Sequence, residues 1–299
     1  MNQLQYQFDV ILMGHLARDI IEVEGKQEVM TGGGVFAGGH AALTMGLKTG
    51  IITRCNKEIS KDGISSLETA GATVFSQDAP ETSGIHNIYD DPSMETRKCK
   101  PLGFAGLFDK KNLPGNWETG YFIICPIIAG ELDLDLLKHL SSRYKDKLCI
   151  DVQGFVRVRV GNDLVFKDWE DKREGLKMIT FLKTDHAEAR NLTGLEDIDD
   201  ALKELSSWGP REILLTHVKG VTVYVKGTTI FYPWKNKSMD GRTGRGDTCF
   251  TSYVGSRLEK KPSEALKFAA AITSLKMEVP GPISRPLEEI LEFEKGIYD

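Results

Sequence analysis

Short apolar runs alternate with helical segments along this chain, and that alternation leaves few folds open to it. Buried strands are expected at 8–13, 50–53, 72–75, 121–125, 148–152, 178–183 and 212–217. Helices are expected between several of these strands and again at 248–258, 263–276 and 286–295. This order is typical of a parallel sheet with helices on both faces. No repeat or linker interrupts residues 1–299, so a single α/β domain is expected.

Two polar hairpins do not fit this alternation. The first pairs 20–23 with 27–30 across the turn Glu24-Gly25-Lys26, and the second pairs 85–89 with 96–99 around 90–93. The two hairpins could form a small flap beside the main sheet, or they could be two separate surface excursions. The pattern alone favours neither arrangement.

Charge and composition exclude several classes of function. With 38 basic and 43 acidic residues the formal net charge is −5, so the chain has no general attraction for nucleic acid or anionic lipid. No apolar run reaches the roughly 18–20 residues that span a bilayer. The N-terminal residues lack the pattern of a secretory signal, and the five cysteines are odd in number without CxxC spacing. We therefore expect a cytoplasmic protein with reduced thiols rather than a disulfide framework or a zinc site.

A glycine-rich segment, Asp240-Gly241-Arg242-Thr243-Gly244-Arg245-Gly246-Asp247, precedes the helix expected at 248–258. The N–H groups at a helix start bind anions, and glycine lets an anion approach the backbone. Asp247 then has two interpretations. It is either a helix cap or a carboxylate beside a bound phosphate that takes a proton from an attacking hydroxyl. The residues alone leave both open.

The other glycine patterns match known phosphate loops less well. Gly25-Lys26-Gln27 lacks the Ser or Thr that follows the lysine of a P-loop. Gly32, Gly34 and Ala37 match a dinucleotide fingerprint only loosely, because a charged hairpin precedes them instead of a clear strand. A nicotinamide-dependent oxidoreductase is kept as an alternative on that segment.

Five motifs, in order along nearly the whole chain, resemble those of the ribokinase-like (PfkB) carbohydrate kinase family. They are Gly14 followed by Asp19, Gly32-Gly33 before a small-residue helix, Asp185-x-x-Glu188, Thr216-x-x-x-Gly220, and Thr243-Gly244-Arg245-Gly246-Asp247. Each motif is weak by itself. Five motifs in the family's order are far more specific than any one of them.

The resemblance implies a three-layer α/β/α fold with a mostly parallel sheet and a small β-lid formed near 15–31 and 84–101. It also implies phosphoryl transfer from ATP, with Mg²⁺, to a hydroxyl of a sugar, polyol or nucleoside. Carried over by position, Asp247 is the general base. The backbone N–H groups of Gly244, Arg245 and Gly246 would hold the charge of the transferring phosphoryl group.

The resemblance also assigns the remaining motif residues to three binding roles. The substrate hydroxyls are contacted by Asp19 and Gly33, magnesium-bound water and phosphate are positioned by Asp185 and Glu188, and the nucleotide site is lined by Thr216 and Gly220.

The chain departs from the family pattern at several positions. Gly241 stands where the first Asp of the late signature is expected, with Asp240 one place earlier. Arg245 replaces the usual Ala, and its side chain either brings a cation near the phosphates or points to solvent. Ala37 stands where many members carry a substrate-binding Asn, so the usual ribose or fructose acceptor should not be assumed. His217-Val218 replaces the first Gly of the nucleotide motif, which is expected to alter the adenine pocket.

These patterns favour a kinase that acts on a small sugar or polyol, including inositol-like and keto-sugar compounds, because nothing obvious supplies stacking for a nucleobase. A nucleoside kinase of the same fold and a nucleotide-binding protein without turnover stay as alternatives. No nucleic acid or membrane partner is expected. The polar hairpins could also pair between chains, which would give a homodimer through the lid.

Overall fold

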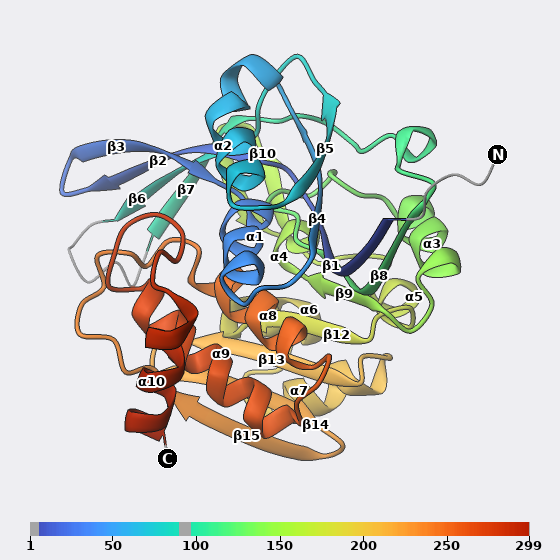
Figure 1. Cartoon of the computed structure of the whole chain (residues 1–299). Helices are drawn as coiled ribbons and strands as arrows, with labels where there is room; N and C mark the ends of the chain where they lie inside the picture. The colour runs from blue at the N-terminus through green and yellow to red at the C-terminus, as the bar shows by residue number, and fades with distance from the viewer. Residues whose placement is uncertain (1–5, 90–96, 299) are drawn as a thin grey trace.

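The structure is a computed structural model that describes residues 6–89 and 97–298 (Figure 1). Its main sheet contains β1 (Tyr6–Met13), β4 (Thr49–Cys55), β5 (Thr73–Asp78), β8 (Trp117–Ile124), β9 (Leu148–Asp151), β12 (Phe181–Asp185), β13 (Glu212–His217), β14 (Gly220–Val225) and β15 (Thr228–Pro233). These nine strands lie in the order β15-β14-β13-β12-β9-β8-β1-β4-β5. The strands from β13 to β5 run parallel, and the β14-β15 hairpin adds an antiparallel edge.

Helices cover both faces of this sheet, as the alternation of strands and helices predicts (Figure 1). One face carries α1 (Gly34–Thr44), α2 (Lys57–Thr69), α8 (Arg245–Ser256) and α9 (Pro262–Lys276), with α10 (Leu287–Tyr298) packed outside α9. The other face carries α3 (Leu134–Arg143), α5 (Lys172–Leu176), α6 (His186–Thr193) and α7 (Ile198–Ser207). Two short helices, α4 (Gln153–Val156) and a 3₁₀ turn at Lys110–Asn112, lie in connections.

Strand β1 shows why the sheet has two apolar faces. Successive side chains of a strand point to opposite sides, so Val10 and Leu12 pack toward α1 and α8 while Ile11 and Met13 pack toward α3. All four side chains are fully buried. The three-layer α/β/α fold expected from the resemblance is confirmed.

A second, four-stranded sheet lies beside the main one. It contains β2 (Ala17–Val23), β3 (Lys26–Gly32), β6 (Gly84–Tyr89) and β7 (Arg97–Gly103), in the order β3-β2-β6-β7. Parallel pairing of β2 with β6, for example Ile20 opposite His86, joins the two hairpins. The flap arrangement is therefore the one observed, and the two hairpins are not separate excursions. The turn expected at 90–93 lies outside the described residues.

A further hairpin, next to the small sheet, was not predicted from the sequence. Strands β10 (Arg157–Val160) and β11 (Asp163–Phe166) form a two-stranded antiparallel sheet. Strand β11 packs against β7, so this hairpin extends the wall that the small sheet begins. Each strand has only four residues, too few for a clear two-residue period.

The helices and the cysteine side chains bear on the expectations about membrane spans and reduced thiols. Within 6–89 and 97–298, no helix combines the length and apolarity that crossing a bilayer requires. All five cysteines are free thiols, and four of them are buried: Cys55, Cys125, Cys149 and Cys249.

Candidate active site

A cavity of about 750 Å³ opens between the main sheet and the small sheet. Asp151, Asp185 and Thr216 line it from the carboxyl ends of β9, β12 and β13. Open α/β sheets bind ligands at this edge, because loops and helix N-termini gather there. Asp19 and Asn87 line the cavity from the small sheet on the opposite side.

Two helix N-termini meet at this cavity. The N-cap residues of α1 and α8 are Gly33 and Gly244, with φ of 94° and 83°, a left-handed region that favours glycine. A Cβ atom at Gly34 would lie 2.8 Å from Oδ1 of Asp247, so glycine at that position lets the carboxylate approach the start of α1. Asp247 itself stands in the first turn of α8. The positive ends of both helices therefore offset part of the cost of burying its negative charge.

The start of α8 offers backbone donors to an anion. The amides of Gly244 and Gly246 donate no hydrogen bond to another of the described residues, whereas the amide of Asp247 interacts with the carboxylate of its own side chain. The amide of Arg245 instead donates to the carbonyl oxygen of Arg242 at 3.1 Å, which closes a turn before the helix. The role of this amide toward a transferring phosphoryl group stays a prediction.

The surroundings of Asp247 raise the pKa of its carboxyl group above the ordinary value. Burial contributes most, and the negative charge of Asp151 adds to it. The positive charges of Lys183 and Arg157 act in the opposite direction. A carboxylate with a raised pKa is a stronger proton acceptor than one in water.

A buried lysine lies between two of the acidic side chains at this edge. Lys183, on β12, is 4% exposed, and its Nζ lies 2.9 Å from a carboxylate oxygen of Asp151 and 3.7 Å from one of Glu188. Burial alone lowers the pKa of Lys183, but Asp151 and Glu188 outweigh burial and raise it. The sequence analysis missed Lys183, although a lysine within an apolar strand needs a buried counterion.

Asp185 and Glu188 form a capping box at the start of α6. The Asp185 side chain accepts the amide of Glu188 at 2.9 Å, and Oε2 of Glu188 accepts the amide of Asp185 at 2.8 Å. The other oxygen, Oε1, is buried without a hydrogen-bond partner among the described residues. Burial, followed by the charge of Asp185, raises the pKa of Glu188 to about 8. Glu188 itself is fully buried and is not among the residues that line the cavity.

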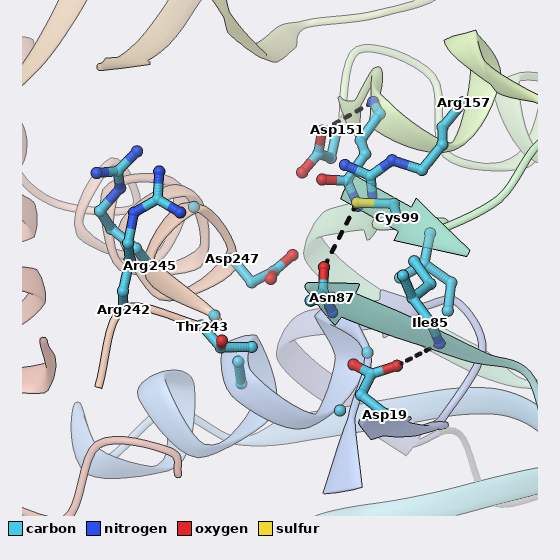
Figure 2. A pocket seen from close by; sticks show the side chains of 18 of the residues that line it. Asp19, Ile85, Asn87, Cys99, Asp151, Arg157, Arg242, Thr243, Arg245 and Asp247 are labelled. Atoms are coloured by element: carbon cyan, nitrogen blue, oxygen red, sulfur yellow. Dashed lines mark hydrogen bonds between the residues drawn. The ribbon is translucent and has the colours of Figure 1, made fainter. Parts of the chain in front are cut away.

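The small sheet contributes a polar wall to the cavity (Figure 2). Asp19 is 7% exposed, and its Oδ1 accepts the amide of Ile85 at 2.8 Å, which ties β2 to β6. Asn87 and Cys99 face each other across β6 and β7, with Sγ 3.6 Å from the amide oxygen. Figure 2 shows Asp247 between this wall and the two arginines Arg242 and Arg245.

Cationic side chains stand on the opposite side of Asp247. Arg242 and Arg245 both line the cavity, so the interpretation of Arg245 as a solvent-facing residue is wrong. Their guanidinium groups lie 5.8 Å from the ring centre of Tyr89 and 5.9 Å from that of Trp234, respectively. Arg157, which the sequence analysis did not single out, also lines the cavity and is buried.

Of the two residues predicted for the nucleotide site, which lie on the paired strands β13 and β14, only one lines the cavity. Thr216 lines the cavity, but Gly220 is not among the lining residues. Gly220 begins β14, where a Cβ atom would lie 2.3 Å from the carbonyl oxygen of Tyr232. Close packing of β14 on β15 therefore explains this glycine without a ligand. Nearby, the ring of His217 stacks between those of His186 and Phe231, each with its centre 5.4 Å away.

Both the sequence and the structure of this chain are similar to those of known kinases. A solved structure of a pyrophosphate-dependent kinase in the ribokinase family, complexed with a pyrophosphate analogue and myo-inositol, is 35% identical. It covers 95% of this chain and 99% of its own, with a TM-score of 0.84. A cytidine kinase from Thermococcus kodakarensis is 26% identical over 267 residues, which are 86% of this chain and 91% of the relative.

A ribokinase from Arabidopsis thaliana, solved with ribose and ATP, is 18% identical with a TM-score of 0.75 and covers 98% of this chain and 99% of its own, so it supports the fold alone. A scan against protein-family models found no match. The 35% identity to the pyrophosphate-dependent kinase, over 95% of this chain, nevertheless establishes the family. The chain is therefore a kinase of the ribokinase (PfkB-like) family.

Proposed function

We propose that this kinase transfers a phosphoryl group from a phosphoanhydride donor to a hydroxyl group of a small polyol, with Asp247 as the general base. One observation carries the proposal. The Asp247 carboxylate lies between the available amides of α8 and the polar wall of the small sheet (Figure 2). A phosphate bound at those amides and a hydroxyl bound at that wall would both be within its reach.

The proposed step needs a base and a charge-stabilising site. The acceptor oxygen attacks the terminal phosphorus, the phosphoanhydride bond breaks, and the remaining phosphate leaves with the bonding electrons. Asp247 takes the hydroxyl proton as the new P–O bond forms, and its raised pKa favours that transfer. The amides of Gly244 and Gly246 would bind the equatorial oxygens, where negative charge gathers.

Mg²⁺ is the metal that the resemblance implies, and the residues fit it. Among the described residues no three His, Cys, Asp or Glu side chains form a complete metal site. Mg²⁺ usually keeps several waters and takes one or two carboxylates together with substrate phosphates. Asp185, which lines the cavity, would hold it on that pattern, and Glu188 would fix the position of Asp185 through the capping box. Bound there, the ion would neutralise charge on the donor phosphates.

We propose a cyclic polyol such as myo-inositol as the acceptor. Asp19 and Asn87 present oxygen and amide groups to the cavity, which suit a ligand that carries neighbouring hydroxyls. The 35% identical kinase structure holds myo-inositol, which supports this class of acceptor. The cytidine kinase relative, at 26% identity, keeps a nucleoside as the second candidate.

The donor predicted from the sequence is ATP, but two features favour pyrophosphate. Arg242 and Arg245 add two positive charges beside the anion-binding helix start, which suits a compact, highly charged donor. His217 replaces the glycine expected in the nucleotide motif, and its ring stacks with those of His186 and Phe231 next to Thr216, so this strand end is bulkier than glycine would make it. The 35% identical relative is described as pyrophosphate-dependent, which agrees with both features.

A matrix of donors and acceptors tests this proposal. Pyrophosphate and ATP are each combined with myo-inositol, ribose and cytidine, and phosphorylated product is measured by ³¹P NMR. We expect the fastest turnover with pyrophosphate and myo-inositol. Faster turnover with cytidine would make the protein a nucleoside kinase, and donor binding without any product would make it a non-catalytic binding protein.

Replacing Asp19 with Asn is expected to raise KM for the acceptor about tenfold, with kcat little changed. Asn keeps the shape of Asp but removes the charge and one acceptor oxygen, so it weakens charge-assisted hydrogen bonds to hydroxyls. Initial rates at varied acceptor and fixed donor measure the effect. An unchanged KM, or a tenfold fall in kcat alone, would remove Asp19 from acceptor binding.

The small sheet would serve as a lid in this reaction. Its polar wall lies across the cavity from the start of α8, so closure over bound substrates would exclude water from the reacting phosphate. The homodimer through this sheet stays a prediction.

A further inference from the structure

Lys276 is a buried cation that the proposed mechanism does not use. It is the last residue of α9, it is 1% exposed, and its Nζ donates hydrogen bonds to the carbonyl oxygens of Gly241 and Thr243. Within the described part of the chain, no carboxylate lies at ion-pair distance from it. The ammonium group is thus bound by backbone oxygens instead of by a counterion.

This environment is that of a bound cation. Backbone carbonyl oxygens are ligands that hard cations take, and the C-terminal end of a helix carries partial negative charge. Burial lowers the pKa of Lys276 to about 8, while the nearby charge of Asp247 acts in the opposite direction. The group therefore still carries its charge at neutral pH.

The two carbonyl groups belong to the loop that sets the start of α8. A Cβ atom at Gly241 would lie 1.9 Å from the carbonyl oxygen of Val279, and the amide of Gly241 donates to the carbonyl oxygen of Met277 at 2.8 Å. This end of the loop is therefore pressed against the residues after α9. The loop ends at Gly244, the N-cap of α8. A Cβ atom added at Gly244 would lie 4.0 Å from Nζ of Lys276, so this end of the loop is close to the ammonium group.

We infer that Lys276 is a positioning residue that acts as a tethered cation for the loop 241–244, so that phosphoryl transfer by this protein needs no added monovalent cation. Without the ammonium group, two buried carbonyl oxygens would face each other without a donor. The loop would then move, and with it the amides of Gly244 and Gly246. The inference rests on the proposed function only in taking those amides as the donor site.

The test replaces Lys276 with Met, which keeps the length of the side chain and removes its charge. We expect kcat/KM for the donor to fall at least about tenfold, as for the loss of a charged hydrogen-bonding group. Adding K⁺ or NH₄⁺ at constant ionic strength is expected to restore part of that loss. The unsubstituted protein is expected to work equally well in K⁺, Na⁺ and tetramethylammonium salts.

The matched control is Lys295→Met, at an exposed site in the last turn of α10, which should leave both the rate and its ion dependence unchanged. A loss in Lys276→Met that no cation reverses would reduce Lys276 to a structural role and overturn the inference. So would a severalfold rise in the rate of the unsubstituted protein when K⁺ is added, a result that remains decisive if Lys276→Met does not fold.

Calorimetric binding of pyrophosphate and of ATP, in the same series of salts, separates this inference from the proposed function. Donor binding that is weakened in Lys276→Met and restored by NH₄⁺ supports the tethered cation even when no acceptor is turned over. Intact donor binding in Lys276→Met would contradict the inference while leaving the proposed transfer reaction in place.

Discussion

Replacing Asp247 with Asn should lower kcat by at least about 100-fold, the range typical of the loss of a general base. Asn has the same size and keeps a hydrogen-bonding oxygen, but it cannot take the proton from an attacking hydroxyl. Because the amides of α8 and the wall of the small sheet stay in place, KM for both substrates should change little. Steady-state rates at saturating donor and acceptor measure the effect.

Asp240→Asn is the matched control for this experiment. Asp240 lies in the same glycine-rich segment, but it is exposed and does not line the cavity. Its substitution should leave kcat unchanged. Near-normal turnover in Asp247→Asn would remove Asp247 from the chemistry and, with it, the central element of the proposed mechanism.

Replacing Arg245 with Gln should lower kcat/KM for pyrophosphate by about 10–100-fold, because a hydrogen bond to a charged group contributes about 1.5–3 kcal/mol. The Arg245 guanidinium group lines the cavity on the other side of Asp247 from the polar wall of the small sheet (Figure 2), which is the side proposed for the donor. KM for the acceptor should therefore stay the same. Initial rates at varied pyrophosphate and fixed acceptor measure the change.

Arg190→Gln controls for the general loss of a positive charge. Arg190 is an exposed residue of α6 that pairs with Glu196, and it does not line the cavity. Its substitution should change neither kcat/KM for pyrophosphate nor KM for the acceptor. If Arg245→Gln raised the acceptor KM instead, Arg245 would belong to the acceptor site, and the argument for pyrophosphate would lose one of its two supports.

The fold was largely predictable because it depends on local periodicity. The apolar run that became β1 is buried on both faces, and the segment before α8 carries the glycines that a helix start with bound anions requires. Asp19 and Asp247 were found through their motifs, and both line one cavity. Their roles in catalysis stay predictions.

The residues that were missed depend on contacts between distant parts of the chain. Lys276 binds Gly241, 35 positions earlier, and no local pattern marks a lysine at a helix end as a ligand of a loop. Lys183 meets Asp151 only because β12 and β9 are neighbours in the sheet. The hairpin at 157–166 is held against β7 by tertiary packing, which overrides the weak preference of its short strands.

The separate small sheet has a consequence for how this enzyme could diversify. The groups proposed to select the acceptor lie on strands of their own, together with the hairpin of β10 and β11, whereas Asp247 and the anion-binding amides lie on helices anchored to the main sheet. If the proposed roles hold, substitutions on the small sheet would change which alcohol is accepted while leaving the helix starts that carry the proposed base and amides unchanged.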